Sequence, residues 1–221
     1  MFTAGFLDPE RADPEGLVGV GGDLSPARLL EAYARGIFPF YDDSMPILWW
    51  SPDPRAIFEL DGLKVSRRLA RTVRSGRFRV TVDRAFSDVV EGCARRRGSD
   101  GVWITHDMAA AYLRLHRLGH AHSVEVWQGD ELAGGLYGVA IGGLFAGESM
   151  FSRVRDASKV ALVFVADRLR RGGFQLFDVQ FVNDHTRSLG AIEISRAEYL
   201  CRLRHALRCD ASFSEPAVAG L

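Results

Sequence analysis

The chain has 221 residues, of which 47% are hydrophobic and 25% charged, and its 28 Lys and Arg residues balance 28 Asp and Glu residues. This length allows one large domain or two small ones, and the zero net charge excludes long-range attraction of nucleic acid, so any such contact needs a local basic patch. The longest apolar runs fall short of a membrane span, Met1-Phe2-Thr3 opens no signal peptide, and three cysteines without C-x-x-C spacing favour a reducing compartment such as the cytoplasm.

The N-terminal part of the chain predicts one helix followed by aromatic loops. Ser25 is placed to cap a helix whose first position is Pro26, and this helix should end at Gly36. The segments 37–41 and 48–55 are rich in aromatic residues and interrupted by proline, so we expect loops and edge strands there.

The rest of the chain alternates helices with strands. Three consecutive strands joined by short turns predict an antiparallel meander, and a helix and a further strand after it predict an α+β fold with a mixed, largely antiparallel sheet. In chain order we expect a helix over 66–75, a strand over 78–82, helices over 84–96 and 107–118, strands over 123–128, 131–140 and 143–149, a helix from 156 or 158 to 171, a strand over 174–181 and a helix over 195–207.

Near Ala56 the aromatic segments interrupted by proline give way to regular helix and strand patterns, and this change divides the chain in two. We expect a small N-terminal α/β domain with aromatic loops over 1–58 and a larger domain over 59–221. The order of meander, helix and strand in the larger domain resembles the core of the GNAT-type acyltransferases. No Q/R-x-x-G-x-G/A loop precedes the helix at Val160, where an acetyl-CoA enzyme would hold pyrophosphate, and this counts against a conventional acetyltransferase.

A carboxylate stands within an apolar strand at Glu148, between Gly147 and Ser149. Burying an ionised carboxylate costs several kcal/mol unless it is paired or hydrogen-bonded. In one interpretation Arg153 or Arg155 pairs with it in a purely structural role. In the other, its small neighbours leave room for a ligand beside the carboxylate.

Two more polar residues, Asp178 and Gln180, lie on one face of the next apolar strand, because residues i and i+2 share a face. Two strands that point polar groups at each other would make a site. The segment 183–186 that follows fits equally well a turn in which Asn183 caps a short helix, and a structural role is then the preferred interpretation for His185.

Four arginines between residues 67 and 74 recur at helical spacing, as in a solvated helix face or in a face that contacts phosphates. The aromatic residues of the chain are mostly core candidates. A ring displayed beside a basic face can instead stack on a base of a single-stranded RNA end.

Four separated segments form a motif set with a specific order and spacing. They are 21–26, 49–55, 147–152, and Gln180 together with 183–185 and 188–191. With these segments the chain resembles the leucyl/phenylalanyl-tRNA–protein transferase family, over about residues 16–203. The resemblance implies transfer of Leu, Phe or Met from aminoacyl-tRNA to proteins that begin with Arg or Lys, which marks them for N-degron proteolysis. It also implies a small N-terminal domain and a GNAT-like C-terminal domain.

The same resemblance assigns roles to individual residues. Gln180 lies near the attacking amine, Asp178 stands behind it as orienting and proton-drawing partner, and Glu148 holds ammonium or hydroxyl groups of the reacting ends. The aminoacyl-adenosine contacts are Trp103, Phe40, Tyr33, Tyr112, Ser149 and Asn183; the donor side-chain pocket is Leu136, Phe145, Met150, Leu162, Val165 and Phe177; and the acceptor-stem backbone meets Arg67, Arg71 and Arg74. Phe40 departs from the Trp that the family often has, and it lacks the indole N–H.

An aminoacyl ester is already activated, so the expected reaction needs no metal and no cofactor. We expect a monomer in the cytoplasm with no membrane contact. Two alternatives stay open: a GNAT-like acyltransferase that uses another donor such as acyl-CoA, and a non-catalytic module that binds RNA ends.

Overall fold

The computed structural model describes residues 5–95 and 104–213. Most of the chain is built around one seven-stranded sheet, in which neighbouring strands are antiparallel except for β8 and β9, which are parallel. In order across the sheet the strands are β10 (Ile192–Ile194), β4 (Arg55–Phe58), β9 (Leu176–Gln180), β8 (Leu144–Ser152), β7 (Glu131–Ile141), β6 (Ala121–Gln128) and β5 (Arg79–Val82). The expected α+β class with a largely antiparallel sheet is confirmed.

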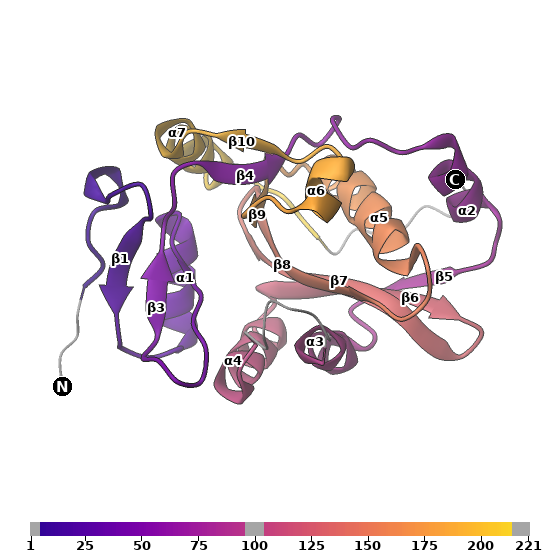
Figure 1. Ribbon diagram of the computed structural model, residues 1–221, viewed down its shortest axis with the longest axis horizontal. Coiled ribbons are helices and arrows are strands. Elements are labelled where there is room, and N and C mark those ends of the chain that lie inside the picture. Colours follow the sequence, from indigo (N-terminus) through magenta and orange to yellow (C-terminus); the bar gives the residue numbers. More distant parts are fainter. Residues whose placement is uncertain (1–4, 96–103, 214–221) are drawn as a thin grey trace.

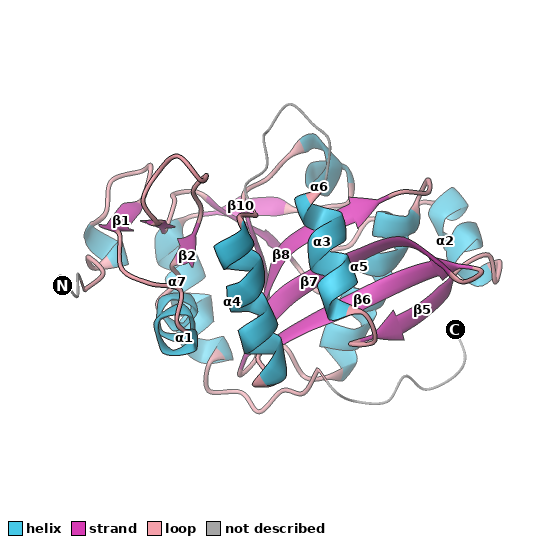
Figure 2. Ribbon diagram, turned by 90° about the horizontal axis from the view of Figure 1, so that it is seen from below, coloured by secondary structure: helices cyan, strands magenta, loops and turns pink. Residues whose placement is uncertain are grey.

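Helices cover both faces of this sheet (Figures 1 and 2). One face carries α3 (Phe86–Ala94) and α4 (His106–Arg117), and the other carries α5 (Ala157–Arg171), against which α2 (Arg67–Arg74) packs. The long helix α5 forms the crossover between β8 and β9, as a parallel strand pair requires. The later part of the chain adds α6 (Asp184–Ser188) and α7 (Arg196–Ala206).

The N-terminal part forms a second, three-stranded sheet. Its order is β1 (Leu17–Val20), β3 (Leu48–Trp50) and β2 (Phe38–Pro39), and α1 (Pro26–Ala34) lies beside it. A short 3₁₀ turn, η1 (Pro9–Arg11), precedes it. The expectation of loops and edge strands over 48–55 is wrong for β3, which is the central strand. Its Trp49 is fully buried and donates from the indole N–H to the carbonyl of Gly21 at 3.0 Å.

Local signals placed the helices within one or two residues. The Ser25 and Ser66 side chains accept hydrogen bonds from the third residue of α1 and α2, as N-caps do, and Gly36 takes a φ of +75° just after α1. The strands β1 and β10 were not expected, because each has only three or four residues and exists through pairing with a partner that is distant in sequence.

Strand β4 lies inside the larger sheet, between β10 and β9, and all four of its residues are buried. The division of the chain into two domains after residue 58 remains a prediction. The four residues of β4, which come just before this boundary, belong to the larger sheet. Within the described ranges, no helix combines the length and the apolar character that crossing a membrane requires.

Candidate active site

A cavity of about 360 Å³ opens where β8 and β9 separate. The two strands pair from Leu144 and Leu176 up to Ala146 and Asp178, and beyond that point β8 continues without this partner. The separation exposes strand edges and side chains to the space between them. The lining residues are Phe38, Pro39, Phe40, Leu136, Gly147, Glu148, Ser149, Met150, Val179, Gln180, Phe181, Asn183, His185 and Thr186.

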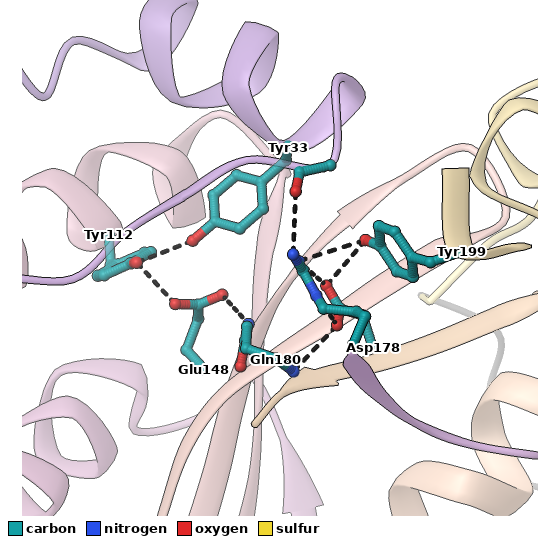
Figure 3. A network of polar contacts seen from close by, with 8 residues as sticks. Tyr33, Tyr112, Glu148, Asp178, Gln180 and Tyr199 are labelled. Atoms are coloured by element: carbon teal, nitrogen blue, oxygen red, sulfur yellow. Dashed lines mark hydrogen bonds and ion pairs between the residues drawn. The ribbon is translucent and has the colours of Figure 1, made fainter. Parts of the chain in front are cut away.

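Glu148 closes the inner end of this cavity and is held by neutral groups. Its Oε2 accepts from the hydroxyl of Tyr112 at 2.7 Å, and that hydroxyl lies 2.8 Å from the hydroxyl of Tyr33 (Figure 3). Its Oε1 accepts from the side-chain amide of Gln180 at 3.0 Å. The structural pairing with Arg153 or Arg155 is wrong, since neither of these hydrogen bonds comes from an arginine.

Burial raises the pKa of Glu148 from its ordinary value of 4.5 to about 7, although hydrogen bonds from Tyr112 and Tyr33 act in the opposite direction. The residue is only 9% exposed, and among the described side chains no cation contacts its carboxylate to offset the loss of hydration. Burial also raises the pKa of both phenols well above 10, so they stay protonated and donate. A carboxyl that titrates near neutral pH suits proton transfer.

Gln180 owes its orientation to an irregular end of β9. The register against β4 shifts between Asp178 and Gln180, which leaves Val179 as the extra residue of a β-bulge, and Gln180 itself takes a φ of +57°. The alternation of side chains is interrupted there. Asp178 and Gln180 were expected to share a face, but their side chains contact different neighbours, Arg55 in one case and Glu148 in the other (Figure 3).

Asp178 is buried behind the cavity in an ion pair with Arg55. The guanidinium binds it in a two-point contact, with Nε 2.8 Å from Oδ1 and Nη2 2.6 Å from Oδ2, and the two residues are 1% and 0% exposed. Tyr199 donates to the same carboxylate at 2.9 Å. Asp178 meets Gln180 through its backbone N–H, at 3.0 Å, and not through its amide side chain.

Arg55 connects this pair to the N-terminal part of the chain. Its Nη1 donates to the carbonyl of Gly36 at 2.9 Å, and its guanidinium carbon lies 4.6 Å from the ring centroid of Phe38, which lines the cavity. Arg55 and Tyr199 received no role from sequence reasoning. A signal for Arg55 existed: a cation that begins the apolar run 56–58 needs a buried carboxylate as partner.

Of the six residues predicted to form the donor side-chain pocket, some line the cavity and the others are buried in the core. Leu136 and Met150 line the cavity. The other four predicted residues are fully buried behind it in one apolar cluster: Phe145, Leu162, Val165 and Phe177. The structure thus brings the six together, with two of them in direct contact with the cavity.

Of the residues predicted to contact the aminoacyl-adenosine, some line the cavity and others are buried. Phe40, Ser149 and Asn183 line the cavity, whereas Tyr33 and Tyr112 are 1% exposed and reach it through Glu148. Trp103 lies outside the described residues. Asn183 also caps α6, because its side chain accepts from the backbone N–H of Thr186 at 2.9 Å.

One further aromatic residue that lines the cavity, Phe181, was missed, and Phe38 was expected only as a core candidate. Phe181 is 47% exposed and its ring lies 5.5 Å from that of Phe38 and 6.1 Å from that of Phe40, which is 40% exposed. We call these three residues the aromatic rim. The exposed rings of Phe40 and Phe181, supported by the buried ring of Phe38, offer a stacking surface next to a polar strand end.

The predicted phosphate-contact residues Arg67, Arg71 and Arg74 are all exposed on α2. They do not line the cavity. Their neighbour Arg68 instead binds Asp156 at the start of α5, with Nη1 2.9 Å from Oδ2 and Nη2 3.1 Å from Oδ1, and so fixes α2 against α5. Among the side chains that the structure describes, no group of three or more His, Cys, Asp or Glu could hold a metal ion.

Comparison with known proteins shows which family this chain belongs to. The family model described as leucyl/phenylalanyl-tRNA protein transferase matches residues 57–204, and the model of its N-terminal domain matches residues 22–53. A leucyl/phenylalanyl-tRNA–protein transferase of Anaeromyxobacter sp. (strain Fw109-5) is 59% identical over 204 residues, which cover 91% of this chain and 87% of that protein. One of Escherichia coli O1:K1 / APEC is 56% identical over 197 residues, 88% of this chain and 84% of that protein.

Among solved structures, a GCN5-related N-acetyltransferase from Kribbella flavida covers 77% of this chain and 61% of its own, at 11% identity and a TM-score of 0.42. The family assignment depends on the sequence matches, which span both sheets and the residues around the cavity. The chain belongs to the leucyl/phenylalanyl-tRNA protein transferase family, a family of aminoacyltransferases.

Proposed function

We propose that this protein transfers Leu, Phe or Met from aminoacyl-tRNA to the N-terminal α-amine of proteins that begin with Arg or Lys. The observation that carries the proposal is the contact of Gln180 with Glu148 inside a cavity with an apolar floor. The basic acceptor residue and the fate of the product in N-degron proteolysis rest on the family resemblance. The predicted cytoplasmic monomer rests on the same ground.

The donor amino acid occupies the cavity with its side chain on Leu136 and Met150. Both residues are flexible and unbranched at Cβ, and a rigid layer of buried phenylalanines supports them. A side chain that is unbranched at Cβ, such as that of Leu, Phe or Met, fits such a surface better than a β-branched one, by roughly 1–3 kcal/mol per methylene-sized difference. The terminal adenine stacks on the aromatic rim, where Phe40 supplies a ring but no indole N–H.

In the transfer step the acceptor nitrogen attacks the ester carbonyl carbon, a C–N bond forms, and the C–O bond to the ribose breaks. The α-ammonium has a pKa near 8 and must first lose a proton. Because the amide nitrogen of Gln180 donates to Glu148, its amide oxygen is the group that accepts from the amine. Glu148, with its pKa of about 7, receives the proton and returns it to the departing ribose oxygen.

Asp178 is a positioning residue in this scheme. Its carboxylate is occupied by Arg55 and Tyr199, and it holds the backbone N–H of Gln180 so that the bulged end of β9 keeps its geometry. Positioning of the amine against the ester then contributes a large part of the rate. The earlier expectation that Asp178 draws a proton through Gln180 stays a prediction.

The direct test supplies tRNA charged with labelled Leu, Phe or Met and a protein that begins with Arg. We expect label on the acceptor, none on the same protein beginning with Ala, and losses of at least about 100-fold for Glu148→Ala and Gln180→Ala. If the wild-type protein binds charged and uncharged tRNA equally and transfers nothing, the module that binds RNA ends is correct. Saturable turnover of a CoA thioester would favour the acyl-CoA alternative.

A further inference from the structure

A second cavity, of about 550 Å³, adjoins the active-site cavity. Met150 and His185 line both, so they form the partition between the two spaces. The second cavity lies between α2, the end of β8 and the first turn of α5. The polar residues in its wall, besides His185, are Arg68, Ser152, Arg155, Asp156, Ser158 and Lys159.

The wall of this cavity has an excess of positive charge. Three of its residues are cationic and one is a carboxylate, and that carboxylate, Asp156, is bound by Arg68 at 2.9 and 3.1 Å. Arg155 and Lys159 have no salt bridge within the part of the chain that the structure describes. Lys159 is half-buried. A partly dehydrated ammonium without a counter-ion is unfavourable, and an anion in the cavity relieves this.

The start of α5 adds to this charge. Asp156 takes a φ of +74° and directs its side chain to Arg68, so it makes no side-chain cap for the 15-residue helix. The backbone N–H groups of Ala157 and Ser158 already donate to the carbonyl of Val154 and the hydroxyl of Ser152. The start of α5 therefore contributes the positive end of the helix dipole beside Lys159. The helix start thus adds to the positive potential of the cavity, whose main source is the excess of cationic side chains in the wall.

We propose that this second cavity, with Arg155 and Lys159, binds the phosphodiester that joins the last two nucleotides of the aminoacyl-tRNA, an inference that rests on the proposed function. The aminoacyl group and the phosphate are on opposite sides of one ribose. With the amino acid on Met150 in the first cavity, the phosphate reaches across the partition into the second. From there Arg68 leads to the exposed arginines of α2, which would follow the next phosphates of the strand.

The test compares three donors that carry the same amino acid: phenylalanyl-adenosine, which has no phosphate, phenylalanyl-CpA, which has one, and phenylalanyl-tRNA. The variant Arg155→Gln/Lys159→Gln removes both cations. Arg117→Gln is the matched control, since Arg117 is exposed at the end of α4 on the opposite face of the sheet. We expect the double variant to use phenylalanyl-adenosine like the wild type. Its KM for phenylalanyl-CpA and for phenylalanyl-tRNA rises on the order of tenfold.

The salt dependence of tRNA use gives a second readout. The slope of log kcat/KM against log salt concentration should become shallower by about 1 in the double variant, and should not change in Arg117→Gln. An equal loss with all three donors, no loss with any, or a loss with phenylalanyl-tRNA alone would each overturn the assignment of the terminal phosphodiester. Failure of the wild-type protein to use any donor would instead refute the proposed function, and this inference with it.

Discussion

Replacement of Arg55 by methionine tests the buried support of the active site. Arg55 and Asp178 are 1% and 0% exposed, and the guanidinium makes both hydrogen bonds of the pair at 2.8 and 2.6 Å. Arg55→Met leaves the carboxylate of Asp178 buried without its cation. Removal of one partner of such a pair costs about 3–5 kcal/mol, against a total stability of typically about 5–15 kcal/mol.

The assay is urea unfolding followed by circular dichroism, with two comparison variants. Arg202→Met removes two ion pairs that are as short, 2.7 Å to Glu59 and 2.6 Å to Glu198, but whose arginine is 36% exposed, and should cost at most about 1 kcal/mol for each pair. Arg55→Met/Asp178→Asn removes the orphaned charge and should recover roughly half of the loss. The reasoning is refuted if Arg55→Met costs no more than Arg202→Met, or if the double variant is as unstable as the single one.

Three further predictions concern the cavity itself. Because the pKa of Glu148 is raised from 4.5 to about 7 in the folded protein, its ionisation destabilises the fold as pH rises through that window. Glu148→Gln should therefore gain on the order of 2–3 kcal/mol over the wild type between pH 4.5 and pH 8 in urea unfolding, and a difference that is constant with pH would contradict this. Phe181→Ala should raise the KM for the aminoacyl-tRNA roughly tenfold and leave kcat nearly unchanged, because base stacking is worth about 1–3 kcal/mol; an unaltered KM would remove Phe181 from the binding surface. Leu136→Phe narrows the floor of the cavity, so kcat/KM should fall more for Phe than for Leu as donor, by about tenfold, and equal losses would place the donor side chain elsewhere.

Much of the fold could be predicted from local pattern. The capping residues Ser25, Ser66 and Ser195 and the periodicity of the following segments located three helices, since each signal acts over only a few residues. The central place of β3 and the strands β1 and β10 could not be found in this way. Short strands have almost no local signal, and they form because a partner far along the chain is already in place.

The candidate site shows the same division. Residue types and motif order identified Glu148, Asp178 and Gln180, and a carboxylate in an apolar strand was reason enough to look there. Their geometry was beyond local pattern. The bulge at Val179 separates the directions of two side chains that regular alternation would place together, and it arises from pairing with β4, more than 100 residues earlier.

The residue types of the site, most helix boundaries and the family could be recognised from the amino-acid sequence, because these depend on neighbouring residues and motif spacing. Which side chains contact one another depends instead on the folded chain. Folding places Tyr112 on Glu148 and Arg55 on Asp178, contacts that join residues 36 and 123 positions apart. Such contacts set the surroundings of each carboxylate. Asp178 is paired with an arginine, whereas burial raises the pKa of Glu148 to about 7.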